Sequence, residues 1–165
     1  MTYSRFEDLP VWQEAIRLAE DVYDMTESRN WKGSHSFRDQ LERAALSVSN
    51  NIAEGFERGT TNELLAFLYI ARGSAGEVRS MLCFLERRDG YTNFKSQISN
   101  FKSVAESCSR QIRAWADHLQ NTDIKGQRHL TEKTKSHYRS KKDVEEFQQE
   151  LLNKLPSDHP FCKGK

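Results

Sequence analysis

Long apolar runs are missing from this sequence of 165 residues. The longest apolar stretches are far shorter than the roughly 18 residues that a membrane-spanning helix requires. The first ten residues, MTYSRFEDLP, also lack the apolar centre of a signal peptide. We therefore expect a cytoplasmic protein. The three cysteines, Cys83, Cys108 and Cys162, are odd in number and widely spaced, which favours reduced thiols over a disulfide framework.

The motifs of common catalytic and metal sites are missing as well. No Glu-x-x-His pair occurs, although a di-iron site in a helical bundle needs such pairs on one helix face. The five histidines show no zinc-ligand spacing with cysteine. There is also no phosphate-binding glycine-rich loop, no Gly-x-Ser-x-Gly elbow and no Cys-x-x-Cys pair. These absences predict a protein that is not an enzyme and uses no cofactor, metal or small-molecule substrate.

Residues that break helices are scarce. The sequence has only three prolines and few β-branched runs, beside 30% charged and 36% hydrophobic residues, which favours an all-α fold. Apolar periodicity predicts helices over about 10–28, 37–53, 60–89 and 92–119. Because the connections between them are short, we expect an antiparallel up-down four-helix bundle over residues 1–120.

The third predicted helix carries the clearest pattern, a heptad seam in which spacings of four and three alternate. Its members are Leu64, Leu68, Ala71, Ala75, Val78, Leu82 and Leu85. A second apolar stripe lies beside the seam, with Phe67, Ile70, Met81 and Phe84. Gly73 and Gly76 interrupt this helix, and each costs about 1 kcal/mol relative to alanine. The two glycines therefore suggest that another backbone approaches closely.

A glycine-marked corner is predicted between the second and third helices. Gly55 and Gly59 bracket it, and Thr60 followed by Glu63 has the spacing of a capping box that starts a new helix. Charged residues of both signs surround the corner: Arg43, Glu54, Arg58, Arg72 and Glu77. Since acids and bases alternate there, we favour a network that joins two helix ends over direct ligand contact. For Asn50 and Asn51 we favour capping of neighbouring backbone or specifying register over reading a nucleotide edge.

Net charge is only +1, but the charges are unevenly distributed. Between Lys125 and Lys142, seven basic residues stand against one acid, Glu132. Apolar periodicity returns only at Val144, Phe147, Leu151 and Leu155. We predict that residues 121–165 form a basic linker plus a short amphipathic helix and are partly disordered.

Basic residues on the last two predicted helices and on this linker are candidates for nucleic-acid binding. The candidates are Arg79, Arg87, Arg88, Lys95, Lys102, Arg110, Arg113, Lys133, Lys135, Arg139, Lys141 and Lys142. A nucleic-acid footprint requires these charges to lie together, and the alternative is an ordinary solvated surface. Symmetric oligomerisation would join modest basic strips into a continuous one.

Four motifs follow one another along the predicted helices. The first motif is Asp8-Leu9-x-Val11-Trp12-Gln13-x-Ala15 and the second is Gln40-Leu41-x-Arg43-Ala44-Ala45-x-Ser47-Val48. The third is Asn51-Ile52-Ala53-Glu54-Gly55 with Arg58, and the last is Phe67-Leu68-x-Ile70-Ala71-x-Gly73-Ser74-x-x-Glu77. In this order the motifs resemble one family, the four-helix-bundle or 23S rRNA intervening-sequence proteins, which includes the accessory variability determinant of diversity-generating retroelements. The resemblance covers about residues 6–120.

The resemblance implies a bundle that assembles into a homopentameric ring. In the retroelement branch it implies a non-catalytic accessory protein whose basic surfaces bind structured RNA and whose partner is a reverse transcriptase. It also implies structural roles for the residues at the matching motif positions, and we add Gly76 for the bundle geometry. These residues are Trp12, Arg43, Asn51, Glu54, Gly55, Gly73, Gly76 and Glu77. A structural oligomerisation module that binds a protein partner and no RNA is the open alternative.

Overall fold

The computed structural model describes residues 3–121, 144, 146–147 and 150. Four long helices account for most of them, namely α1 (Pro10–Glu27), α2 (His35–Glu57), α3 (Thr61–Glu86) and α4 (Lys95–Gln120). Two 3-10 turns precede α1 and α4, namely η1 (Phe6–Asp8) and η2 (Thr92–Phe94). No strand occurs in these described residues, so the all-α prediction is confirmed. The chain divides into two units, Met1–Arg128 and His129–Lys165, and the four helices belong to the first.

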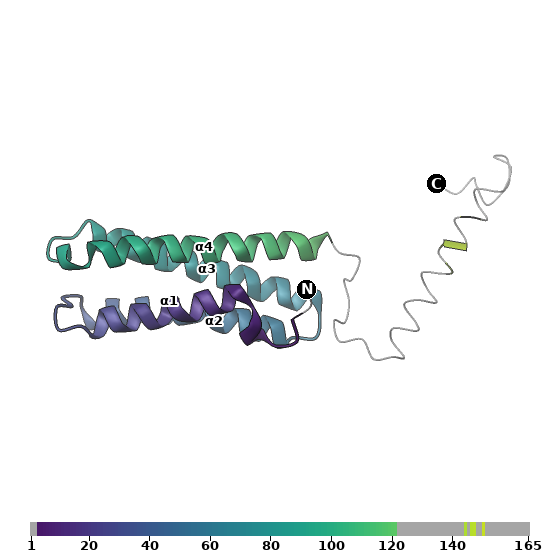
Figure 1. Ribbon diagram of the computed structural model, residues 1–165, viewed down its shortest axis with the longest axis horizontal. Helices are drawn as coiled ribbons and strands as arrows, with labels where there is room; N and C mark the ends of the chain where they lie inside the picture. The colour runs from purple at the N-terminus through teal and green to yellow at the C-terminus, as the bar shows by residue number, and fades with distance from the viewer. Residues whose placement is uncertain (1–2, 122–143, 145, 148–149, 151–165) are drawn as a thin grey trace. The chain divides into compact units, whose positions relative to one another are not determined.

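The four helices close around a shared core, because each packs against its neighbours in the chain and α1 also packs against α4. In Figure 1 the α1–α2 and α3–α4 connections lie at one end of the bundle, and the α2–α3 connection lies at the other. Residues 28–34 and 87–91, which are far apart in the sequence, therefore share one end of the bundle.

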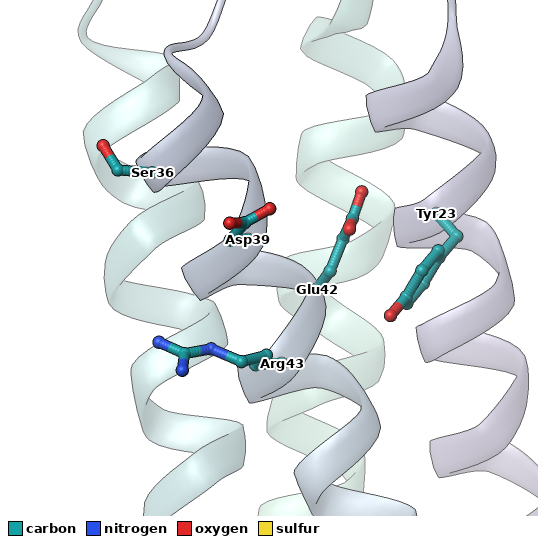
Figure 2. Close-up of a pocket in the computed structure, with 5 residues that line it drawn as sticks. All are labelled: Tyr23, Ser36, Asp39, Glu42 and Arg43. Atoms are coloured by element: carbon teal, nitrogen blue, oxygen red, sulfur yellow. The ribbon is translucent and has the colours of Figure 1, made fainter.

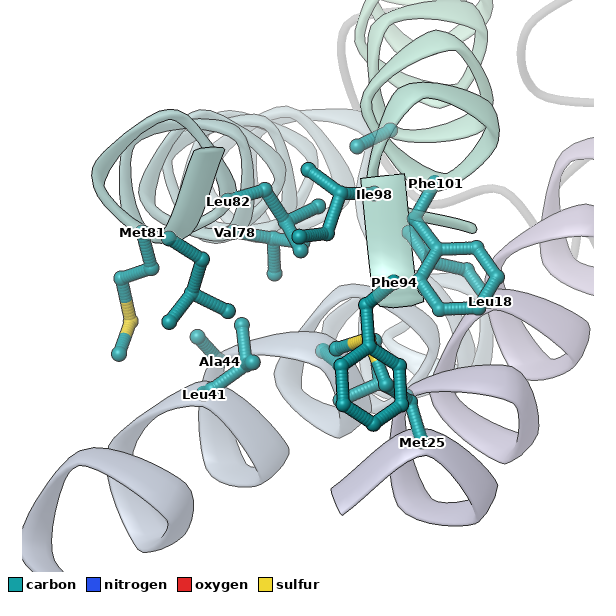
Figure 3. Close-up of a cluster of buried hydrophobic side chains, with 14 of the residues drawn as sticks. Leu18, Met25, Leu41, Ala44, Val78, Met81, Leu82, Phe94, Ile98 and Phe101 are labelled. Atoms are coloured by element: carbon teal, nitrogen blue, oxygen red, sulfur yellow. The ribbon is translucent and has the colours of Figure 1, made fainter. Parts of the chain in front are cut away.

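The predicted heptad seam of α3 is the centre of the core. All seven of its residues are at most 1% exposed. Figure 3 shows the part of the core that contains Val78 and Leu82 of this seam, together with Leu18 and Met25 of α1, Leu41 of α2, and Ile98 and Phe101 of α4. Each such buried side chain contributes on the order of 1.5–3 kcal/mol to the free energy of unfolding.

Side-chain caps fix the starts of two helices. The Ser34 hydroxyl accepts from the Phe37 amide at 3.3 Å and begins α2 at His35, two residues before the predicted start. The Thr60 hydroxyl accepts from the Glu63 amide at 3.3 Å and also lies 2.7 Å from the Glu63 carboxylate. Each hydroxyl thus satisfies a backbone amide that has no partner within its helix. The predicted capping signal at Thr60 is confirmed.

The prediction that the second helix ends near Ala53 is wrong. Helix α2 continues to Glu57, and Gly55 is a buried residue inside it. A Cβ atom at Gly55 would lie 2.8 Å from Cβ of Phe67 and 3.1 Å from Cδ1 of Leu64. The glycine thus marks the closest approach of α2 to α3 and not the corner, which residues 58–60 form.

Two other details of α3 differ from the predictions. The helix ends at Glu86, three residues before Asp89, and Gly90 in the following connection has a φ of +97°, which favours glycine. The second stripe beside the seam is partly exposed, because Ile70 and Phe84 are each 51% exposed. No described atom lies within 4 Å of a Cβ placed on Gly73 or Gly76, so the close approach predicted there does not occur within the described chain.

The predicted basic linker and most of the terminal amphipathic helix lie outside the described residues. The exceptions are Val144, Glu146, Phe147 and Glu150, all of which are helical. Across the part of the chain that the structure describes, no helix combines the length and apolar character needed to cross a bilayer.

Candidate nucleic-acid interface

Four of the seven candidate cations on α3, α4 and their connection form ion pairs. The pairs are Arg79–Glu106 at 3.5 Å, Lys102–Glu86 at 2.7 Å, Arg110–Glu106 at 3.4 Å and Arg113–Asp117 at 3.6 Å. The hydrogen bond to Glu86 raises the pKa of the Lys102 ammonium. A phosphate would have to displace a carboxylate at each of these positions. They are therefore weaker candidates than cations that carry no acidic partner.

The other three candidates, Arg87, Arg88 and Lys95, lie in or next to the α3–α4 connection. All three are exposed, and none forms an ion pair with a described residue. Arg29 and Lys32 of the α1–α2 connection join them; both are exposed and likewise lack an ion pair within residues 3–121. We call these five residues, at the end of the bundle formed by residues 28–34 and 87–91, the cationic end.

The two connections are in direct proximity. A Cβ atom at Gly90 would lie 3.5 Å from Cδ and 3.9 Å from Nζ of Lys32. Asp89 is the one carboxylate in residues 28–34 and 87–91, against four arginines and lysines. The cationic end is therefore a site of net positive charge on the described part of the molecule, and this charge is not neutralised by internal ion pairs.

Sequence reasoning missed Arg29 and Lys32. These residues belong to neither the last two helices nor the basic linker, and they are more than fifty positions from Arg87 in the sequence. The predicted bundle topology could have identified them, because antiparallel helices joined by short connections place the first and third connections at the same end of the bundle. A sum of charges along the chain cannot show this, since the grouping is spatial.

An aromatic cluster lies at the same end. Ring centroids are 5.5 Å apart for Trp31 and Tyr91, 6.3 Å for Trp31 and Phe37, and 5.4 Å for Phe37 and Phe84. Burial raises the pKa of the Tyr91 phenol, although the charge of Arg88 opposes that shift. Phe84 remains half exposed, and the guanidinium carbon of Arg88 lies 5.8 Å from its ring centroid. The cationic end therefore combines accessible charge with one accessible aromatic ring.

The matching family model is described as 23S rRNA-intervening sequence protein, and it covers residues 7–114. That span includes α1, α2, α3 and most of α4. The chain belongs to this family. The crystal structure of a protein of unknown function from the S23 ribosomal protein family of Bacteroides thetaiotaomicron VPI-5482 is similar to this intervening-sequence protein, with a TM-score of 0.57 and 16% identity. The match covers 65% of this chain and 95% of the other, and at that identity it shows the shared fold alone. No curated protein matches the chain.

Three of the motif residues with predicted structural roles make contacts within α2 or with α3. The Asn51 amide donates to the Ser47 carbonyl at 2.7 Å, and Glu54 pairs with Arg58 at 2.6 Å. Glu77 accepts from the Gln40 amide at 3.0 Å and so connects α3 to α2. Asn51 and Glu54 thus make local contacts, and Glu77 makes a contact between two helices, at motif positions of the intervening-sequence protein.

The other motif residues have different environments. Trp12 is half-buried, with its ring centroid 5.2 Å from that of Phe6. Arg43 is exposed, and Gly73 and Gly76 face open space on α3. Within the described chain, therefore, no packing contact explains either glycine.

A shallow hollow between α1 and α2 is the pocket seen in Figure 2. Tyr23 from α1 and Ser36, Asp39, Glu42 and Arg43 from α2 line it. The hollow mixes both signs of charge, and Glu42 is already engaged by Arg38 at 2.6 Å. Residues 3–121 also contain no group of three or more His, Cys, Asp or Glu side chains arranged to hold a metal ion. The cationic end is thus the stronger candidate site.

The predicted tail cations lie outside the described residues, so their positions remain a prediction. They are Lys133, Lys135, Arg139, Lys141 and Lys142.

Proposed function

We propose that this intervening-sequence protein is a non-catalytic accessory protein that binds structured RNA through the cationic end. The observation that carries the proposal is the set of five exposed arginines and lysines that no described carboxylate pairs with. Unpaired cations bind phosphates without first breaking an ion pair, and they release the counterions of the RNA when they do so. The protein acts by positioning RNA and forms no covalent bond with it.

The proposal includes assembly into a ring and a reverse transcriptase as partner, as in diversity-generating retroelements. The exposed face of α3 supports assembly, because Ile70 is half exposed and Gly73 leaves room for a second backbone. In a homopentamer, five cationic ends would form one extended basic surface. The proposal of a reverse transcriptase as partner is supported only by the motif resemblance of residues 6–120.

A salt series tests RNA binding. We expect the affinity for a labelled RNA hairpin to fall as salt rises, and the triple variant Lys32→Gln, Arg87→Gln, Arg88→Gln to reduce the slope by about one unit per lost phosphate contact. The matched control is Arg110→Gln with Arg113→Gln, which removes cations that already pair with Glu106 and Asp117. It should change the slope less. Affinity that is independent of salt, or equal in all these proteins, contradicts the proposal.

A second arm of the same experiment tests the tail. Replacing Lys133, Lys135, Arg139, Lys141 and Lys142 with glutamate should also weaken RNA binding if the tail takes part. Unchanged binding would remove the tail from the interface and leave the cationic end.

The alternative function is an oligomerisation module that binds protein and no RNA. One observation favours it: Tyr69, Ile70 and Phe84 on α3 are each between 45% and 51% exposed. Isolated exposed apolar residues are common, but three on one helix beside two open glycines suit a protein contact. Failure of RNA binding together with a change of assembly on mutation of α3 would support this alternative.

A further inference from the structure

Phe84 is an unusual member of the aromatic cluster because it is both anchored and exposed. Its ring centroid is 5.4 Å from that of Phe37, which in turn lies 6.3 Å from Trp31. The Phe84 residue is nevertheless 51% exposed. A fixed ring with an accessible surface loses little conformational freedom when another planar group stacks on it.

The surroundings of Phe84 are positively charged. The Arg88 guanidinium carbon lies 5.8 Å from the Phe84 ring centroid, and Arg87 follows on the same connection. Neither arginine pairs with a described carboxylate, whereas Glu86 is held by Lys102 at 2.7 Å. Phosphates on either side of a stacked base would therefore meet two cations that are free to bind them.

The opposite end of the bundle offers a comparison. There the Arg58 guanidinium carbon lies 5.1 Å from the Phe67 ring centroid, so the same pair of residue types is present. Phe67 is only partly exposed, however, and Arg58 pairs with Glu54 at 2.6 Å. Only the pair at the cationic end leaves both the ring and the positive charge accessible.

We infer that the cationic end binds an unpaired segment of RNA, with one base stacked on Phe84 and the flanking phosphates held by Arg87, Arg88 and Lys32. An aromatic side chain needs an unstacked base, which a loop, bulge or single-stranded end provides and an intact duplex does not. The exposed Arg88 guanidinium can bind a phosphate or cover the second face of the base. This inference rests on the proposed RNA binding and specifies the form of RNA at that site.

Three labelled RNAs test the inference by fluorescence anisotropy: a blunt hairpin, the same hairpin with a 3′ extension of about ten nucleotides, and that extension made abasic. We expect the wild-type protein to bind the extended hairpin more tightly than the other two. Phe84→Leu should weaken binding of the extended hairpin by roughly tenfold to a hundredfold, because leucine keeps apolar contact with Phe37 but cannot stack. Phe84→Tyr should retain the affinity. Arg58→Gln is the control at the opposite end and should have little effect.

Several results would overturn the inference while leaving the proposed function intact. One is salt-dependent binding of all three RNAs with equal affinity, and another is an unchanged affinity of the Phe84→Leu protein for the extended hairpin. If Phe84→Leu instead changes the oligomer mass measured by light scattering, Phe84 belongs to an interface between protein chains and the inference is wrong. Absence of binding to every RNA would overturn the proposed function itself. Circular dichroism of each variant checks that the helices are intact.

Discussion

Two carboxylates connect α1 to both of its neighbours. Glu14 accepts from the Ser107 hydroxyl of α4 at 3.1 Å and from the Gln111 amide. On the other side, Glu42 of α2 is 8% exposed and accepts from the Thr26 hydroxyl and from Arg38. A partly buried carboxylate with such partners stabilises the fold and is not free to act on a ligand. Both acids are therefore structural.

Cys108 is the buried thiol of the bundle, and its environment makes it unreactive. Burial in the core, with a smaller contribution from the charge of Glu14, raises the pKa of this thiol to about 12. The thiolate is the reactive form, and it is scarce far below the pKa. We expect iodoacetamide at mildly alkaline pH to alkylate the half-buried Cys83 much faster than Cys108, as read by peptide mass spectrometry. In urea the two rates should become similar.

The same shift has a consequence for stability. The folded-state pKa is raised, so the folded protein keeps its proton at a pH where the unfolded chain loses it. The stabilising contribution of Cys108 is complete below the unfolded pKa of about 9 and declines as pH rises toward about 12.

Rapid alkylation of Cys108 in the folded protein would contradict the alkylation prediction, because it would show that the core around this thiol opens readily.

Glycines have opposite roles in two of the helices. Gly55 in α2 lies where a Cβ would come within 2.8 Å of Phe67, whereas Gly73 and Gly76 in α3 meet open space. Alanine stabilises an exposed helix position by about 1 kcal/mol relative to glycine. At Gly55 this gain is exceeded by overpacking, which typically costs about 1–3 kcal/mol.

We therefore predict that alanine substitutions at these glycines change the free energy of unfolding in opposite directions in α2 and α3. Gly55→Ala should lower the free energy of unfolding by about 1–2 kcal/mol, and Gly73→Ala or Gly76→Ala should raise it by about 0.5–1 kcal/mol when measured by urea denaturation of the monomer. If Gly73→Ala lowers stability only at concentrations where the protein is assembled, the glycine lies in an interface between copies. A stabilising Gly55→Ala would show that α2 and α3 separate at little cost.

At the scale of the whole molecule, the exposed face of α3 leads to a prediction about assembly. Ile70→Lys places a charge on a side chain that is 51% exposed, so the fold of one chain should be unaffected. If α3 forms the ring contact, this charge would be buried without a partner, and we expect a shift from oligomer to monomer by light scattering. Ala114→Lys on the exposed side of α4 is the matched control and should keep the wild-type mass. An unchanged oligomer in the Ile70→Lys protein would exclude this face from assembly.

Much of the fold follows from the sequence because its signals are local. The heptad seam from Leu64 to Leu85 predicts a buried helix face, and the seam is at most 1% exposed in the structure. The helix boundaries given by Pro10 and Thr60 are also local, since they depend on backbone geometry and capping. The role of Gly55 is not local. A glycine at a turn and a glycine at a helix crossing have the same sequence signature, and only the position of Phe67 distinguishes them.

The candidate site depends on tertiary structure still more strongly. The sequence by itself determined the all-α fold, the family motifs and the presence of Arg87, Arg88 and Lys95. Only the folded bundle decided that Arg79 and Lys102 are engaged by carboxylates, because Glu106 and Glu86 meet these partners across helices. The Arg110–Glu106 and Arg113–Asp117 pairs, by contrast, are four residues apart within α4. The folded bundle also brought Lys32 against Gly90 and left Phe84 exposed beside Arg88. The grouping of charges and the exposure of a side chain depend on where residues lie in space. Both depend on the α1–α2 and α3–α4 connections meeting at one end of the bundle.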